Sequence, residues 1–255
     1  MNKLENKVAV ITGGSGGIGF ATAKLFLAEG ARVLLVDRDE KTLTQVCHSL
    51  GSQSAKYCVA DVSKTSDVKN YVAAAIQHFG AIDILFDNAG IEGHASTLVD
   101  MSEEDFDRVL SVNIKGAWLG LKYCAPEMMK RGGGSIMITS SVAGLRGSPN
   151  LGHYVTSKHA VIGLMRSAAI ELGPKKIRVN TINPGPINNR MMRSIEEQFA
   201  PGAGAQVKAG FELKIPLGRY GENEEVAKLA LFLSSSDSEY LTGGTYVVDG
   251  GYTAG

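Results

Sequence analysis

Cysteine, proline and tryptophan are scarce in this chain of 255 residues, which contains 3, 7 and 1 of them. The cysteines, Cys47, Cys58 and Cys124, are odd in number and show no Cys-x-x-Cys spacing, so a disulfide framework is not indicated. We expect reduced thiols in or near a core, as in cytosolic proteins. No group of His, Cys, Asp and Glu has metal-ligand spacing, so we expect no metal.

Neither sign of charge is in excess, because 26 Lys and Arg balance 26 Asp and Glu. No net field therefore favours nucleic acid or an anionic membrane as a partner. Residues 1–7 are polar, and the apolar run after them is far too short for a signal sequence or a membrane span. A hydrophobic content of 44% fits a soluble globule, and we expect a cytoplasmic protein.

Apolar, strand-like runs alternate with helix-like runs along the chain. This alternation predicts an α/β, doubly wound (Rossmann-type) fold, in which helices cover both faces of a parallel sheet of about seven strands. No linker or repeat divides the chain, so we expect a single domain over residues 1–255. We expect strands near 7–12, 32–36, 56–60, 82–87, 134–140, 177–182 and 245–249, and helices near 18–29, 40–50, 66–79, 103–130, 153–172 and 223–234.

The segment 188–215 departs from this alternation, because Pro201-Gly-Ala-Gly204 interrupts it. We expect a mobile substrate lid there, with a short helix around Arg190–Phe199. Apolar side chains recur in this helix at roughly helical spacing, and they either line an apolar substrate pocket or bury one helix face. They are Met191, Met192, Ile195 and Phe199.

A glycine-rich turn, Thr12-Gly-Gly-Ser-Gly-Gly-Ile-Gly19, joins the first strand-like run to a helix-like run. Glycines let the backbone approach a pyrophosphate closely, and a helix N-terminus offers free N–H groups and a partial positive charge to that anion. The next strand-like run ends in Asp37, whose carboxylate can accept hydrogen bonds from both hydroxyls of an adenosine ribose. Strand, turn, helix and acid together predict dinucleotide binding.

Tyr154 and Lys158 stand four residues apart, so on a helix they share a face. A cation beside a phenol favours the phenolate, so we expect Lys158 to lower the pKa of Tyr154. Ser141, or its neighbour Ser140, follows another strand-like run and could hold a carbonyl oxygen at the same place. Because ligands of open α/β sheets lie outside the carboxyl ends of the strands, we expect Asp87–Gly90 and Pro184–Ile187 to meet there too.

These motifs follow one another in an order that is typical of one enzyme family. Thr12-Gly-x-x-x-Gly17-x-Gly19, Asn88-Ala-Gly90, Asn113, Ser141, Tyr154-x-x-x-Lys158 and Pro184-Gly185 resemble the short-chain dehydrogenase/reductase family over nearly the whole chain. The resemblance implies an NAD(H)-dependent enzyme that transfers a hydride between nicotinamide and a secondary alcohol or its ketone. It assigns general acid/base chemistry to Tyr154, the substrate oxygen to Ser141, the nicotinamide ribose to Lys158, and a proton-relay water to Asn113.

The resemblance further implies that Asp61 and Val62 meet the adenine, although Asp61 could instead be an acid at a helix N-terminus. We expect NAD rather than NADP because Asp37 would repel a 2′-phosphate, and we expect Arg38 to stack near the adenine or face solvent. The predicted cofactor contacts are Gly13, Ser15, Gly16, Gly17, Ile18, Gly19, Asp37, Arg38, Asp61, Val62, Asn88, Ala89, Gly90, Tyr154, Lys158, Pro184, Gly185, Ile187 and Asn189.

Two positions depart from the family pattern: Asp87, where an Asn is usual, and Asn189, where a Thr is common. By analogy we expect a homotetramer that acts on a small alcohol or ketone with substantial apolar surface. One alternative is a cofactor-binding regulator without turnover, which the complete set of catalytic residues disfavours. Another is an epimerase or dehydratase of the longer relatives, whose extra C-terminal domain we do not find in this sequence.

Overall fold

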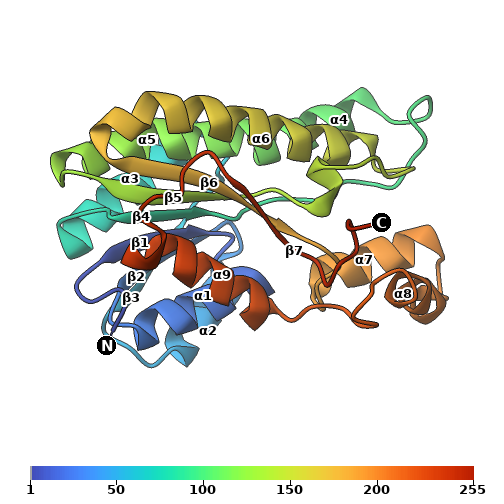
Figure 1. Cartoon of the computed structure of the whole chain (residues 1–255), viewed down its shortest axis with the longest axis horizontal. Helices are drawn as coiled ribbons and strands as arrows, with labels where there is room; N and C mark the ends of the chain where they lie inside the picture. Colours follow the sequence, from blue (N-terminus) through green and yellow to red (C-terminus); the bar gives the residue numbers. More distant parts are fainter. Residues whose placement is uncertain (1) are drawn as a thin grey trace.

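Seven strands form one parallel sheet in the order β3-β2-β1-β4-β5-β6-β7 (Figure 1). This computed structural model describes residues 2–255 and confirms the predicted doubly wound fold. Both β1 and β4 are buried along their whole length, which explains their uninterrupted apolar sequences. The strands are β1 (Val8–Thr12), β2 (Arg32–Asp37), β3 (Ala55–Val59), β4 (Ile84–Asp87), β5 (Gly134–Thr139), β6 (Ile177–Pro184) and β7 (Thr245–Val248).

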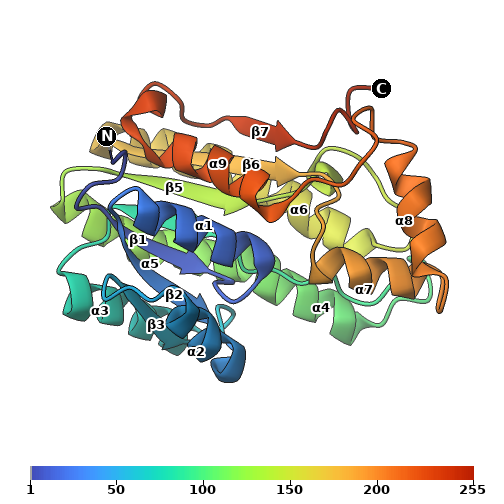
Figure 2. The same cartoon turned by 90° about the horizontal axis from the view of Figure 1, so that it is seen from below.

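Helices cover both faces of the sheet, as the two views show (Figures 1 and 2). Helices α1 (Gly17–Ala28), α2 (Glu40–Ser49) and α9 (Asn223–Ser234) pack on one face, where Phe26 and Leu43 are fully buried. On the other face lie α3 (Thr65–Phe79), α5 (Gly116–Lys130) and α6 (Gly152–Leu172), with Tyr71 and Met165 in the core. Short 3₁₀ turns lie at η2 (Val142–Gly144), η3 (Gly173–Lys175) and η4 (Ser236–Ser238).

The helix that we expected over 103–130 is interrupted. Helix α4 (Glu103–Leu110) passes into a π-helical turn, η1 (Ser111–Lys115), before α5 begins. The extra residue of a π turn changes which side chains face inward, and such turns are frequent at functional sites. The other predicted strands and helices are present, and their ends differ by at most two residues.

Two helices stand apart from the layered body, beyond the carboxyl ends of the strands (Figures 1 and 2, orange). Helix α7 (Arg190–Phe199) has the predicted bounds, and the Asn189 side chain caps it by accepting a hydrogen bond from the Met192 N–H at 3.3 Å. Helix α8 (Gly204–Glu212) was not expected, since its sequence is short and none of its residues is buried. Among residues 2–255, no helix combines the length and apolar character that a membrane span needs.

Candidate active site

One cavity of about 740 Å³ lies at the carboxyl ends of the strands and reaches from the glycine-rich turn to α7. Its walls include Ser141, Tyr154 and Lys158, whereas Asn113 lies behind the wall. Of the predicted cofactor contacts, all but Gly19 line it. The fold therefore brings the dispersed motifs of the sequence to one place, as the rule for open α/β sheets predicts.

The glycine-rich turn needs its glycines for two separate reasons. Gly13 has a φ of +64°, a left-handed backbone conformation that side chains disfavour. A Cβ on Gly19 would lie 2.2 Å from the carbonyl oxygen of Gly13, so this glycine lets helix and turn pack closely beneath the cavity. Gly16 precedes α1 and provides no side-chain cap, which leaves the first N–H groups of the helix for an anion.

Asp37, the last residue of β2, lines the cavity beside the glycine-rich turn. Its Oδ2 accepts hydrogen bonds from the Ser15 N–H at 3.1 Å and the Ser15 hydroxyl at 2.6 Å. The carboxylate is therefore fixed beside the turn where the phosphates of a dinucleotide would lie. Asp61 also lines the cavity, and it accepts hydrogen bonds from the N–H and hydroxyl of Ser63, so it organises the turn before α3 as well.

The ends of β1, β4 and β5 are tied together by hydrogen bonds beneath the middle of the cavity. The Thr12 hydroxyl accepts hydrogen bonds from the N–H groups of Asn88 and Ala89 at 2.9 and 3.0 Å. The Asn88 side chain in turn accepts a hydrogen bond from the Thr139 hydroxyl at 3.1 Å. These bonds fix the floor of the cavity at the point where β1 and β4 diverge.

Tyr154 and Lys158 lie on the same face of α6, as the spacing predicted, and both are buried. The Lys158 ammonium lies 5.5 Å from the centre of the Tyr154 ring and donates a 2.8 Å hydrogen bond to the Thr139 carbonyl. The Ser141 hydroxyl, rather than that of Ser140, is a hydrogen-bond partner of the Tyr154 phenol. Ser140 also lines the cavity, but its hydroxyl donates a 2.8 Å hydrogen bond to the Lys158 carbonyl.

The pKa of Tyr154 differs from our expectation. Burial raises it to about 12, with a further contribution from Glu92, although the hydrogen bond from Ser141 acts in the opposite direction. Lys158 does not bring this pKa below its usual range. Burial acts on the lysine as well, and lowers the pKa of Lys158 to about 8. At neutral pH the phenol therefore carries its proton, which is the form that can donate to a substrate oxygen.

Asn113 lies in the π-helical turn, and its side chain is fully engaged. Its Oδ1 accepts a hydrogen bond from the Ile91 N–H, and its Nδ2 donates to the Ile91 carbonyl and the Ser157 hydroxyl, all at 2.9 Å. The amide thus joins the loop after β4 to α6, close to the catalytic pair. A Cβ on Gly90 would lie 3.4 Å from the Lys158 Nζ, which shows how closely this loop approaches the lysine.

The other half of the cavity has an apolar wall formed by α7. Both readings of α7 hold, because Met191, Met192, Ile195 and Phe199 line the cavity and also pack around Leu151 and Tyr154. Several lining residues were missed in the sequence, since they reach the cavity only through the path of η2, α8 and the C-terminal segment. They are Ala143, Arg146, Leu151, Phe211, Lys214 and Tyr252.

The residues fit a nicotinamide dinucleotide. The turn requires glycine at Gly13 and Gly19, the helix N-terminus lacks a side-chain cap, and Asp37 stands where an adenosine ribose would lie. Within the described range 2–255, no three His, Cys, Asp or Glu side chains are placed to hold a metal ion.

Comparisons with known proteins agree with this geometry. The model of a family described as enoyl-(acyl carrier protein) reductase matches residues 13–253. Dehydrogenase/reductase SDR family member 4 of Bos taurus is 39% identical over 252 residues, or 98% of this chain and 88% of that protein. Cyclohexanol dehydrogenase of Acinetobacter sp. (strain SE19) is 37% identical over 255 residues, or 99% of this chain and 97% of that protein.

The same relationship holds in three dimensions. The crystal structure of levodione reductase superposes with a TM-score of 0.96 at 37% sequence identity, covering 98% of this chain and 99% of that one. The match extends over the sheet, its helices and the cavity-lining segments. The chain therefore belongs to the short-chain dehydrogenase/reductase family of oxidoreductases, whose dehydrogenases use nicotinamide cofactors.

Proposed function

We propose that the protein is an NAD(H)-dependent enzyme that interconverts a secondary alcohol and its ketone. The observation that carries this proposal is the position of three side chains. Tyr154, Ser141 and Lys158 stand where the glycine-lined half of the cavity meets the apolar half. A carbonyl group held there would present its carbon to a nicotinamide and its oxygen to the proton donor.

The proton chemistry follows from the hydrogen bonds. The Ser141 hydroxyl donates a long, 3.5 Å hydrogen bond to the Pro184 carbonyl and is otherwise a partner of the Tyr154 phenol, so its proton can turn to a substrate oxygen that lies beside Tyr154. That hydrogen bond stabilises the negative charge which grows on the oxygen during reduction. Tyr154, protonated at neutral pH, then transfers its proton to this oxygen. The nicotinamide, when bound, supplies or accepts the hydride.

Lys158 favours the same proton transfer. Its ammonium lies beside the Tyr154 ring, so it stabilises the phenolate left after proton transfer. The Thr139 carbonyl fixes its direction through the 2.8 Å hydrogen bond, and the nicotinamide ribose would lie within reach of the remaining N–H groups. Asn113 keeps the Ile91 backbone in place at the edge of this group.

The apolar half of the cavity favours a compact substrate with substantial apolar surface. Cyclohexanol dehydrogenase, by its name, acts on a cyclic alcohol, and the apolar side chains of α7 would suit such a ring. We propose cyclic alcohols and ketones as the substrate class. We also keep as predictions the single catalytic domain over 1–255, the lid at 188–215, the homotetramer and the cytoplasmic location.

A panel of substrates tests the proposal. Reduction of NAD⁺ would be followed with cyclic alcohols, steroids, sugars, polyols and hydroxyacyl thioesters, and oxidation of NADH with cyclic ketones and 2-enoyl thioesters. We expect turnover of cyclic alcohols and their ketones. If only enoyl thioesters are turned over, the activity is reduction of a carbon–carbon double bond and not of a carbonyl group. If the cofactor binds but no compound is turned over, a regulator without enzymatic activity is favoured.

A further inference from the structure

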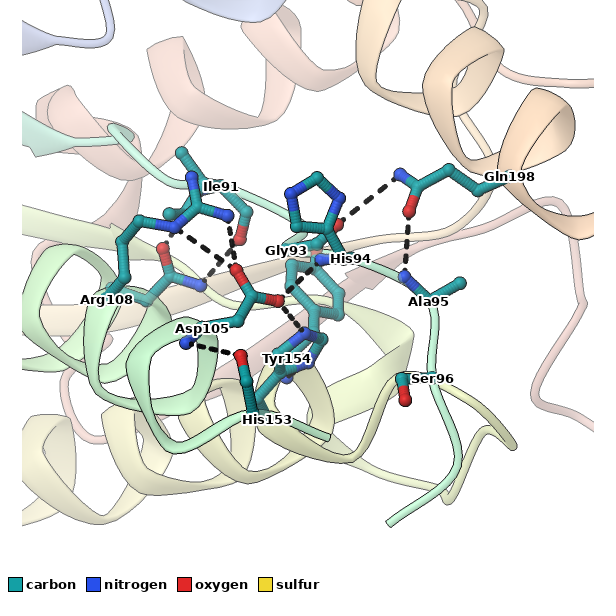
Figure 3. Close-up of polar contacts among 12 residues, drawn as sticks. Ile91, Gly93, His94, Ala95, Ser96, Asp105, Arg108, His153, Tyr154 and Gln198 are labelled. Carbon is teal, nitrogen blue, oxygen red and sulfur yellow. Dashed lines mark hydrogen bonds and ion pairs between the residues drawn. The ribbon is translucent and has the colours of Figure 1, made fainter. Parts of the chain in front are cut away.

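The loop after β4, residues 91–96, is held by side chains from three different elements (Figure 3). We call it the pocket loop. Asn113 of η1 binds both backbone groups of Ile91, and Asp105 of α4 accepts a hydrogen bond from the His94 N–H at 2.7 Å. Gln198 of α7 accepts one from the Ala95 N–H, also at 2.7 Å.

Asp105 links the pocket loop to the start of the catalytic helix. His153, which is completely buried, places its Nε2 3.0 Å from the same Asp105 oxygen that binds the His94 N–H. The Nδ1 of His153 accepts a 2.8 Å hydrogen bond from the Tyr154 N–H. Because Nδ1 is an acceptor, the proton of this neutral imidazole is on Nε2 and is donated to Asp105.

The carboxylate at the centre of this network stays ionised. Burial raises the pKa of Asp105, but hydrogen bonds from Arg108, the His94 N–H and His153 outweigh burial and lower that pKa to about 2. The backbone at Gly93 packs directly against the His153 ring, since a Cβ there would lie 2.3 Å from the His153 Nε2. The backbone N–H of Tyr154 and the pocket loop are therefore parts of one rigid, fully hydrogen-bonded unit.

Gln198 attaches α7 to this unit. Besides accepting from the Ala95 N–H, its Nε2 donates to the Gly93 carbonyl at 3.4 Å and to Ser194 at 3.2 Å. Over residues 2–255, no other side chain of α7 hydrogen-bonds to the pocket loop. Ile195 and Phe199, one turn before and one residue after Gln198, are the cavity-lining side chains of α7 that lie nearest to it along the helix.

We propose that Gln198 is a positioning residue for the substrate: its carboxamide fixes α7 against the pocket loop, so that the apolar wall and Tyr154 keep a constant separation. The inference rests on the proposed function, because it takes the apolar half of the cavity as the substrate site. Gln198 does not line the cavity, so it acts through the helix that carries Ile195 and Phe199. Cofactor binding takes place at the other half and does not depend on it.

Steady-state kinetics separate a positioning role from general support of the fold. In Gln198→Ala, KM for a cyclic ketone should rise about tenfold, as expected for the loss of one or two hydrogen bonds. The kcat value and the affinity for NADH should change less than about threefold, since the reacting groups are untouched. Gln198→Glu keeps an acceptor for the Ala95 N–H and should recover most of the loss. Gln206→Ala, an exposed glutamine of α8 with no hydrogen-bonded side chain, is the matched control.

Amide hydrogen exchange tests the same contact without any substrate. In Gln198→Ala the Ala95 amide should exchange faster while the His94 amide, bound to Asp105, stays protected. Unchanged exchange at Ala95 overturns the inference even if the panel finds no substrate. Where a substrate is known, an unchanged KM, equal losses in kcat and KM, or a glutamate variant no better than alanine also overturns it.

Discussion

The buried carboxyl group of Asp87 accepts a 2.9 Å hydrogen bond from the Thr12 hydroxyl through one oxygen, while its other oxygen has no hydrogen-bond partner among residues 2–255. Thr12 also holds the N–H groups of Asn88 and Ala89, so the hydrogen bond belongs to the floor of the cavity. The unpartnered oxygen lies against α5, where a Cβ on Gly120 would come within 2.5 Å of it. A site that the family usually fills with an amide here contains an acid.

Asp87→Asn should make the stability of the protein less dependent on pH. Burial raises the pKa of Asp87 to about 7, against about 4 in the unfolded chain, despite hydrogen bonding to Thr12 and the charge of Lys158. Between these values the folded state binds more protons than the unfolded state, so the free energy of unfolding falls as pH rises. The melting temperature of the variant minus that of the wild type should therefore increase from pH 4 to 7 and then level off.

Only the change of this melting-temperature difference with pH tests the prediction, because the new amide also shifts the melting temperature by an amount that does not depend on pH. Asp107→Asn, which alters an exposed acid of α4, is the matched control. A melting-temperature difference that stays the same from pH 4 to 7 would show that Asp87 is ionised in the folded protein throughout this range.

The sequence predicted the features that depend on short stretches of the chain. Buried parallel strands read as apolar runs, and the glycine-rich turn, Asp37 and the Tyr154/Lys158 pair are all short-range patterns. The π-helical turn at Asn113 was not predictable, since it depends on contacts with Ile91 and Ser157, which are 22 and 44 residues away. The prediction of a lowered pKa for Tyr154 was wrong in direction, because burial, which raises this pKa, is a property of the whole fold.

Limited proteolysis should reveal movement of the lid. Trypsin can cut 188–215 after Arg190, Arg193, Lys208 or Lys214, and α7 and α8 lie outside the layered body of the protein (Figure 2). Cofactor together with substrate should slow these cuts, because a closed lid excludes water and completes the site. Cleavage after Lys175 or Lys176, exposed residues between α6 and β6 that do not line the cavity, gives the internal reference. Equal cleavage of 188–215 with and without ligands would count against a lid.

Asp37 should make the enzyme prefer NAD to NADP. Its carboxylate is fixed by Ser15 at the position where a 2′-phosphate would approach, and repulsion plus lost hydroxyl hydrogen bonds favour NAD by on the order of 10²-fold or more. Comparison of kcat/KM for NADH and NADPH measures this ratio. Asp37→Ala should bring this ratio closer to one, because it weakens the binding of NADH and relieves the repulsion of NADPH. A preference for NADPH in the wild type would show that Arg38 outweighs Asp37.

The central claim is that Tyr154 exchanges a proton with the substrate, and Tyr154→Phe tests it most directly. The variant keeps the ring, which packs beside Leu151 and Ile195, and loses only the hydroxyl. With a cyclic ketone and NADH at pH 7, we predict that kcat falls about 10²- to 10⁴-fold, the range typical of a general acid, while the Kd of NADH from fluorescence titration changes little. Turnover close to that of the wild type would contradict the account.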